Sequence, residues 1–343
     1  MSDINDPFAE LGLRRVLNAR GTSTSLGAAP VRPGIMEAVA GIVSTNVEMM
    51  PLQARASAAI AKATGAEAGF VTSCAASGIS IASAACMTGS DLAAIERLPD
   101  TRHLERDEVV LLKGQALDYS GNLTQMIRLA GAVPVEIGAV NSSSLYQMAG
   151  AMGARTAAAI YTVSEQACPM GMLELDDFIA CAKQAGVPVI VDAAPEFDLR
   201  KFIAAGADLV IYSAHKKIGS LTAGIVAGRK DLVRACLMQE RGIGRAMKVG
   251  KEGVAGVIAA LGLYQGLDMQ AERARLDALN KISVDRLSTL RGLTVFTVAD
   301  ATGRGFESVR IVANPELAGL TAMQLVRALG EGDPPVKGQD YYA

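Results

Sequence analysis

The chain has 343 residues, of which 50% are apolar and 20% are charged, and its mean hydropathy is +0.27. This composition excludes an intrinsically disordered protein and suffices for two lobes with a sizeable core. The 33 basic and 35 acidic residues give a formal net charge of −2. Because there is neither a surplus nor a run of positive charge, a nucleic-acid partner is disfavoured.

The N-terminal segment 1–21 has no apolar stretch behind a basic one, so the sequence predicts no signal peptide and a cytoplasmic location. Residues 68–90 carry no charge, and about 20 apolar residues can span a bilayer. Their Ala, Ser, Thr, Gly and Cys side chains drive insertion weakly. We therefore expect a strand ending at Val71, a tight loop and a buried helix, and no membrane partner.

The five cysteines, at positions 74, 86, 168, 181 and 236, are scattered, and there are only two histidines. This pattern predicts neither a disulfide framework nor a metal site. The glycines of 242–247 lack the third position of a dinucleotide fingerprint, and 244–252 has the wrong spacing for a P-loop.

Short apolar runs rich in Val and Ile begin at 108, 132, 157, 187, 207 and 223. They are nearly continuous, which is typical of strands buried on both faces of a parallel sheet. The segments between them have helical spacing and end in glycine. The pattern predicts a layered α/β domain.

After Gly250 the apolar spacing becomes that of one long helix over 251–292. Strands at 292–300 and 306–314 and a helix at 320–332 follow. We expect an N-terminal segment, 1–39, that joins a small lobe, a large domain, 40–245, and a linker helix with the small C-terminal domain, 246–343.

Asp192 and Lys216 carry the most informative chemistry. Each follows an apolar run, and ligands of open parallel sheets bind beyond the carboxyl ends of the strands. A lysine amine can form a Schiff base with pyridoxal phosphate, while a carboxylate keeps the pyridine nitrogen protonated. Taken singly, the aspartate could be a helix cap and the lysine a solvated side chain. The small residues and hydroxyls around Lys216 favour the cofactor, with Lys217 as the competing amine.

Residues 72–78 are the expected phosphate site. Hydroxyls and small residues here open a helix, whose free N–H groups bind anions. A helix of small residues also arises from tight packing alone. Cys74 is expected to contribute its backbone rather than a nucleophile, because no histidine partner is in view.

The runs 16–27, 64–78, 186–194, 212–228 and 244–252 together resemble fold-type I pyridoxal-phosphate enzymes of the bacterial selenocysteine synthase group, most of all its D-glucosaminate-6-phosphate ammonia-lyase branch. The resemblance implies an α/β fold of the aspartate aminotransferase type. Its large domain has a mostly parallel central sheet, and a small α/β lobe accompanies it. The resemblance also implies a homodimer or higher homo-oligomer. The tRNA-binding N-terminal domain of selenocysteine synthases has no counterpart before about residue 20, which argues against a tRNA substrate.

The resemblance assigns Lys216 to the Schiff base and Asp192 to the pyridine nitrogen. It also assigns residues near the phosphate or the ring: Ser73, Cys74, Ala75, Ser213 and Gln115. Arg245 and Lys248 match a basic pair that reaches a phosphate or the substrate across a dimer interface. A solvated helix face is the alternative for Arg245.

The expected reaction is loss of a β-hydroxyl and then ammonia from an amino sugar acid or a β-hydroxy amino acid, which gives a 2-keto acid. Lys216 is the expected base at Cα, and His215 either donates a proton or contacts the cofactor phosphate. Arg20 and Arg310 are expected carboxylate clamps, because a guanidinium binds a carboxylate with two hydrogen bonds. The alternatives are an aminotransferase, a selenocysteine synthase-like transferase, and a scaffold of this fold without activity.

Overall fold

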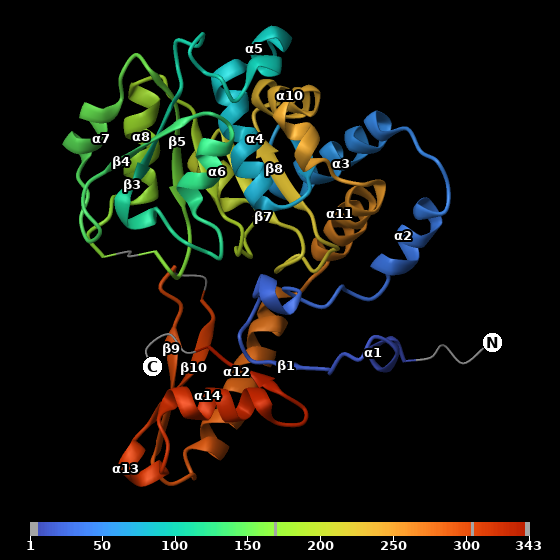
Figure 1. Ribbon diagram of the computed structural model, residues 1–343, viewed down its shortest axis with the longest axis vertical. Helices are drawn as coiled ribbons and strands as arrows, with labels where there is room; N and C mark the ends of the chain where they lie inside the picture. Colours follow the sequence, from blue (N-terminus) through green and yellow to red (C-terminus); the bar gives the residue numbers. More distant parts are fainter. Residues whose placement is uncertain (1–5, 168–169, 303–304, 340–343) are drawn as a thin grey trace. The chain divides into compact units, whose positions relative to one another are not determined.

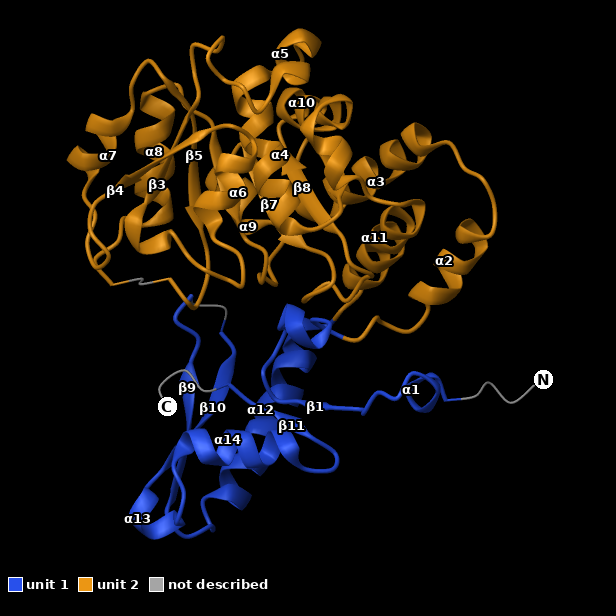
Figure 2. Cartoon of the chain, in the orientation of Figure 1, with its two compact units in different colours: residues 1–29, 268–343 blue, residues 30–267 orange. Residues whose placement is uncertain are grey.

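The computed structural model describes residues 6–167, 170–302 and 305–339. The chain divides into two compact units, which are coloured separately in Figure 2: residues 30–267 form the larger unit, and residues 1–29 with 268–343 form the smaller one. Among the described residues, no helix is long and apolar enough to cross a membrane.

Residues 40 and 245 are the limits of the large domain expected from the sequence. The larger unit starts before residue 40 and extends beyond residue 245. Helix α11 (Lys251–Tyr264) packs against α2 (Ile35–Val43) and α3 (Met49–Thr64). These three helices bury apolar residues in one common core, so all of them belong to the larger unit.

A central sheet of seven described strands organises the larger unit, in the order β2-β8-β7-β6-β5-β3-β4 (Figure 1). The strands are β2 (Ala68–Thr72), β3 (Glu108–Leu112), β4 (Val133–Ile137), β5 (Thr156–Thr162), β6 (Val189–Asp192), β7 (Leu209–Ser213) and β8 (Gly224–Gly228). Of these, β8 runs antiparallel to both neighbours, and the other pairs are parallel. The expected mostly parallel sheet is therefore confirmed, and the carboxyl ends of six strands share one edge with the amino end of β8.

Helices cover both faces of this sheet (Figure 1). One face packs on α2, α3, α8 (Leu175–Gln184) and α11, and the other on α4 (Ala75–Thr88), α6 (Leu123–Leu129) and α10 (Lys230–Met238). Within β7, Val210 and Tyr212 point into the first core and Leu209 and Ile211 into the second. Burial on both faces explains the continuous apolar runs. Edge strand β4 is the exception, since most of it is only half-buried or exposed.

Shorter helices complete the larger unit: α5 (Leu92–Arg97), α7 (Leu145–Ala151), α9 (Lys201–Ala205), and the 3-10 turns η2 (Lys113–Gln115), η3 (Gln239–Arg241) and η4 (Ile243–Met247). Edge strand β2 is closed by a side chain, because the Gln53 amide donates to the Val71 carbonyl at 2.9 Å and accepts from its N–H at 3.2 Å.

The smaller unit contains two strand pairs, parallel β1 (Leu17–Asn18) with β11 (Val336–Lys337) and antiparallel β9 (Leu293–Ala299) with β10 (Glu307–Ala313). Its helices are α1 (Pro7–Glu10), η1 (Thr24–Leu26), α12 (Met269–Leu287), α13 (Pro315–Ala318) and α14 (Ala322–Glu331).

The prediction of a single long helix over 251–292 is wrong. The chain forms α11 and α12, and Asp268 begins the second helix by accepting hydrogen bonds from the N–H groups of Gln270 and Ala271 at 2.9 and 3.0 Å. An aspartate N-cap of this kind starts a new helix rather than continuing the previous one.

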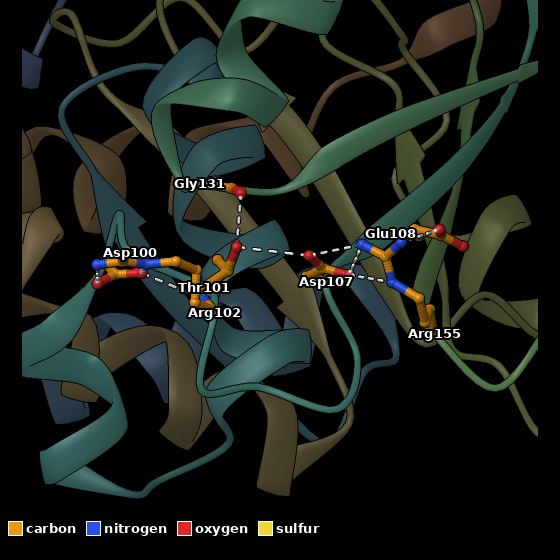
Figure 3. Close-up of polar contacts among 7 residues, drawn as sticks. All are labelled: Asp100, Thr101, Arg102, Asp107, Glu108, Gly131 and Arg155. Atoms are coloured by element: carbon orange, nitrogen blue, oxygen red, sulfur yellow. Dashed lines mark hydrogen bonds and ion pairs between the residues drawn. The ribbon is translucent and has the colours of Figure 1, made fainter.

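An ionic cluster fastens the amino ends of β3 and β5 (Figure 3). The Asp107 carboxylate accepts from the Arg155 guanidinium at 2.7 to 3.0 Å, and Glu108 lies 3.3 Å from the same guanidinium. Thr101 links Asp107 to the Gly131 carbonyl. This cluster lies at the amino edge of the sheet, and its charges pair with one another. The polar groups at the carboxyl edge are arranged differently.

Candidate active site

Strand register brings four polar residues to the carboxyl edge of the sheet. Thr162 at the end of β5 pairs with Asp192 at the end of β6. On β8, Gly224 pairs with Thr72 of β2 on one side and with Ser213 of β7 on the other. The sheet order thus gathers side chains that are far apart in the sequence.

Asp192 is buried, with 5% of its surface exposed. Its carboxylate accepts a hydrogen bond from the Ala194 N–H at 3.2 Å. Burial raises the pKa of Asp192 to about 6, although the Ala194 N–H and the positive charge of Lys216 act in the opposite direction. The carboxyl and the Lys216 amine are therefore within electrostatic reach of each other.

Lys216 is half-buried in the tight connection between β7 and β8. The Lys216 N–H donates to the Ser213 carbonyl at 3.3 Å, and the Ser220 N–H closes the turn on the Ala214 carbonyl at 2.9 Å. Lys217 points elsewhere, because its amine lies 4.3 Å from the centre of the Phe197 ring. Of the two amines that the sequence left in competition, the Lys216 amine is the one whose charge acts on the pKa of Asp192.

Arg32 supports this connection, although no sequence motif points to it. Its guanidinium donates to the Ile218 carbonyl at 2.9 Å and to the Lys217 carbonyl at 3.1 Å, and its backbone N–H donates to the Gly219 carbonyl at 2.9 Å. Because 186 residues separate Arg32 from Ile218, no local pattern could have revealed the contact.

The start of α4 is where an anion site is expected, and its first N–H groups are available for that role. The Cys74 Sγ caps the helix by accepting from the Ser77 N–H at 3.4 Å, while the Ser77 hydroxyl accepts from the Cys74 N–H at 3.0 Å. Ser73 and Ser77 hydroxyls lie 3.1 Å apart. As the first two residues of the helix, Ala75 and Ala76 have N–H groups without an intrahelical acceptor. These N–H groups suit a phosphate.

Gln115 is buried at the end of η2, and its side-chain oxygen accepts from the Thr162 N–H at 2.9 Å. It therefore joins the ends of β3 and β5. The Thr162 Oγ1 and the Tyr119 hydroxyl are buried without a hydrogen-bond partner among the described residues. No sequence motif points to either residue.

His215 and Ser213 lie next to each other, with 3.3 Å between the His215 Nδ1 and the Ser213 Oγ. Burial, followed by the charge of Lys216, lowers the pKa of His215. The ring is therefore neutral at pH 7, which favours a hydrogen-bonding role over proton donation.

The four remaining residues expected at the site are basic. Arg245 and Lys248 are exposed at and just after η4, and Arg245 lies near Glu240, whose pKa is raised by burial and lowered in part by that arginine. Arg20 and Arg310 belong to the smaller unit, where Arg20 donates to the Gln339 side-chain oxygen at 2.5 Å and Arg310 lies on β10.

Cys168 lies outside the described residues, and the four described cysteines are free thiols. Within the described part of the chain, no group of three or more His, Cys, Asp or Glu residues could hold a metal ion.

The donor set at this edge fits pyridoxal phosphate. It offers a lysine amine, a buried carboxyl, a helix N-terminus and two orphaned hydroxyls. The space beside the helix N-terminus requires a glycine, since a β-carbon built on Gly224 would lie 2.3 Å from the Cys74 carbonyl oxygen.

Comparison with known proteins agrees with this arrangement. Residues 16–291 match the family model described as SelA: L-seryl-tRNA selenium transferase. The chain is 37% identical to D-glucosaminate-6-phosphate ammonia lyase of Salmonella typhimurium, over 97% of this chain and 89% of that one. It is 38% identical to 5'-C-glycyluridine monooxygenase-decarboxylase of a Streptomyces species, over 97% and 84%.

A solved structure of D-glucosaminate-6-phosphate ammonia-lyase has a TM-score of 0.88 at 37% identity, covering 98% of this chain and 90% of that one. The fold and the site together define a pyridoxal-phosphate-dependent enzyme of fold type I. Within that class, the chain belongs to the SelA: L-seryl-tRNA selenium transferase family.

Proposed function

We propose that the protein is an ammonia-lyase that removes the β-hydroxyl and then ammonia from an amino sugar acid, giving a 2-keto acid. The observation that carries this proposal is the buried Asp192 carboxyl at the carboxyl edge of the sheet, on which the charge of Lys216 acts, in a chain 37% identical to D-glucosaminate-6-phosphate ammonia lyase.

Bound pyridoxal phosphate supplies an electron sink for the electrons released at the substrate Cα. Lys216 Nζ would bind the cofactor in the absence of substrate, and it would remove the Cα proton once a substrate amine has replaced it. The Asp192 carboxylate keeps the ring nitrogen protonated. Its burial strengthens that interaction, because little water screens it.

Ser73, Cys74 and Ala75 at the start of α4 would hold the phosphate, together with Ser213 and the neutral His215. Gln115 keeps the ends of β3 and β5 together. Arg32 fixes the connection from which Lys216 projects, and so limits where Nζ can be.

Arg20 and Arg310 are the proposed clamps for the substrate carboxylate, and Arg245 and Lys248 for a phosphate. The proposal includes a homodimer, in which these cations can come from both subunits. It also includes a cytoplasmic location. Light scattering of the purified protein measures the subunit number, and a monomer with full activity would contradict the dimer.

A coupled ammonia assay tests the reaction. The panel contains 2-amino-2-deoxy sugar acids with and without a 6-phosphate, and D- and L-β-hydroxy amino acids. We expect ammonia and a 2-keto acid from a sugar acid, also under anaerobic conditions. Transfer of the amino group to a keto acid without net ammonia would identify an aminotransferase instead. Strict dependence on oxygen with release of carbon dioxide would favour the reaction named for the Streptomyces relative.

A further inference from the structure

The Tyr119 hydroxyl is buried without a hydrogen-bond partner among the described residues. Most buried polar groups in native proteins are paired, because an unpaired donor loses its hydrogen bonds to water without replacement. A hydroxyl in this state therefore indicates a partner outside the polypeptide.

The segment around Tyr119 is held in one conformation. The Asp118 carboxylate accepts from the N–H groups of Ser120 and Gly121 at 2.9 and 3.1 Å, and Asn122 caps α6 by accepting from the Thr124 N–H at 2.9 Å. The Tyr119 ring packs against the core on the α4 side of the sheet. The hydroxyl is thus carried by a hydrogen-bonded segment and is buried rather than solvated.

The surroundings of the hydroxyl identify the site that it faces. Burial is the largest cause that raises the pKa of Tyr119, and the charges of Asp192, Cys74 and Asp118 add to it. The group stays protonated at neutral pH and is a hydrogen-bond donor. Asp192 and Cys74 are the residues proposed above for the ring nitrogen and the phosphate, and the Tyr119 ring packs on the same core as Ala75 at the start of α4.

We propose that Tyr119 is a cofactor-binding residue, whose hydroxyl donates a hydrogen bond to an oxygen atom of bound pyridoxal phosphate. The inference rests on the proposed placement of the cofactor between Asp192 and α4. The phosphate and ring oxygens are the acceptors that the cofactor offers on this path. Nothing in the proposed reaction otherwise uses this hydroxyl.

The test compares Tyr119→Phe with the matched variant Tyr212→Phe. The Tyr212 hydroxyl is also buried, but it donates to the Leu199 carbonyl at 3.0 Å and lies in the opposite core. For each protein, the apo form is prepared, its melting temperature is measured, and it is titrated with pyridoxal phosphate and with pyridoxal.

For Tyr119→Phe we expect an unchanged or raised melting temperature of the apo form and an affinity for pyridoxal phosphate that falls about tenfold. For Tyr212→Phe we expect the reverse, a lower melting temperature and an unchanged affinity. If the loss of affinity is confined to pyridoxal phosphate, the acceptor is a phosphate oxygen. If it extends to pyridoxal, the acceptor is on the ring.

An affinity of Tyr119→Phe equal to that of the wild type would overturn the inference, as would a drop in apo stability like that of Tyr212→Phe. Neither readout uses substrate, so a failed ammonia assay leaves this inference standing. Conversely, an unchanged affinity leaves the proposed reaction standing.

Discussion

The carbonyl oxygen of Cys74 lies against the α-carbon of Gly224, so closely that an added β-carbon would be 2.3 Å away. The same β-carbon would also lie 2.3 Å from the Thr72 hydroxyl oxygen. Gly224 begins β8 and pairs with the last residue of β2. The start of α4 and the end of the Lys216 connection are therefore in direct contact through a position that admits only glycine.

Gly224→Ala should push the Cys74 carbonyl aside and disturb the anion site. We expect the affinity for pyridoxal phosphate to fall at least tenfold and stability to fall by about 1–3 kcal/mol, the usual range for overpacking. Titration with the cofactor and urea unfolding measure the two effects. Gly262→Ala in α11 is the control, because its β-carbon meets nothing within 4 Å. That variant should be slightly more stable and bind the cofactor normally.

Arg32→Gln should misplace the Lys216 amine by loosening the Lys217 and Ile218 carbonyls. We expect kcat to fall by roughly tenfold to a hundredfold while KM changes less, since small misplacements of reacting groups have effects of this size. Arg32→Lys should restore part of the loss. The control is Arg200→Gln, which also removes a guanidinium from a backbone carbonyl, that of Lys62 at 2.7 Å. Equal losses in both variants would contradict a positioning role.

Asp192 should make the apoprotein less stable as the pH rises. Its native pKa of about 6 lies above the ordinary 3.8, so the native state binds its proton more tightly than the unfolded state. The resulting loss of unfolding free energy is absent below about pH 4 and grows between pH 4 and 6. Above that it is complete, at roughly 3 kcal/mol at most.

Asp192→Asn should therefore stabilise the apoprotein at pH 8 and not at pH 4, and it should lose most turnover when loaded with cofactor. Urea unfolding of both apoproteins at the two pH values checks the first expectation. A stability difference that does not change with pH would show that the carboxyl is already ionised without cost.

Lys216 should carry the cofactor. Borohydride reduction of the loaded enzyme followed by peptide mapping should label Lys216, and Lys216→Ala should lose the visible absorption band while it remains folded. Lys217→Ala should keep the band, because that amine lies over the Phe197 ring. A label on Lys217 would reject the assignment.

Asp107→Asn should lower stability by about 1–3 kcal/mol without changing cofactor affinity, because a largely buried carboxylate that binds Arg155 is lost at the edge opposite the site. Asp100→Asn should have no measurable effect, since the Arg102 side chain in its ion pair is 89% exposed. Figure 3 shows both pairs. Loss of cofactor affinity in Asp107→Asn would mean that the two sheet edges are coupled.

The strands, and the polar residues that directly follow them, could be located from the sequence. Apolar runs located β3 to β8, and Asp192 and Lys216 stand out because each follows such a run. Thr162 also ends a predicted strand, but its place beside Asp192 depends on the order of the strands, which periodicity does not reveal.

Arg32 and Tyr119 could not be predicted for different reasons. Arg32 acts on backbone carbonyls, which have no side-chain pattern to read. Tyr119 lies in an irregular segment, where only the folded structure shows that its hydroxyl lacks a partner. The break between α11 and α12 was missed because helical spacing continues on both sides of Asp268.

The antiparallel direction of β8 limits where the chain can change length without disturbing the site. Since β7 and β8 are neighbours in the sheet, the connection that carries Lys216 is anchored at both ends, by the Ala214 N–H bond to the Ala223 carbonyl and by the strands themselves. An insertion there would separate the amine from Asp192. The segment after β5 leads into α8 and tolerates changes in length more readily. New substrates are therefore most easily accommodated through that segment, while the connection that carries Lys216 keeps its length.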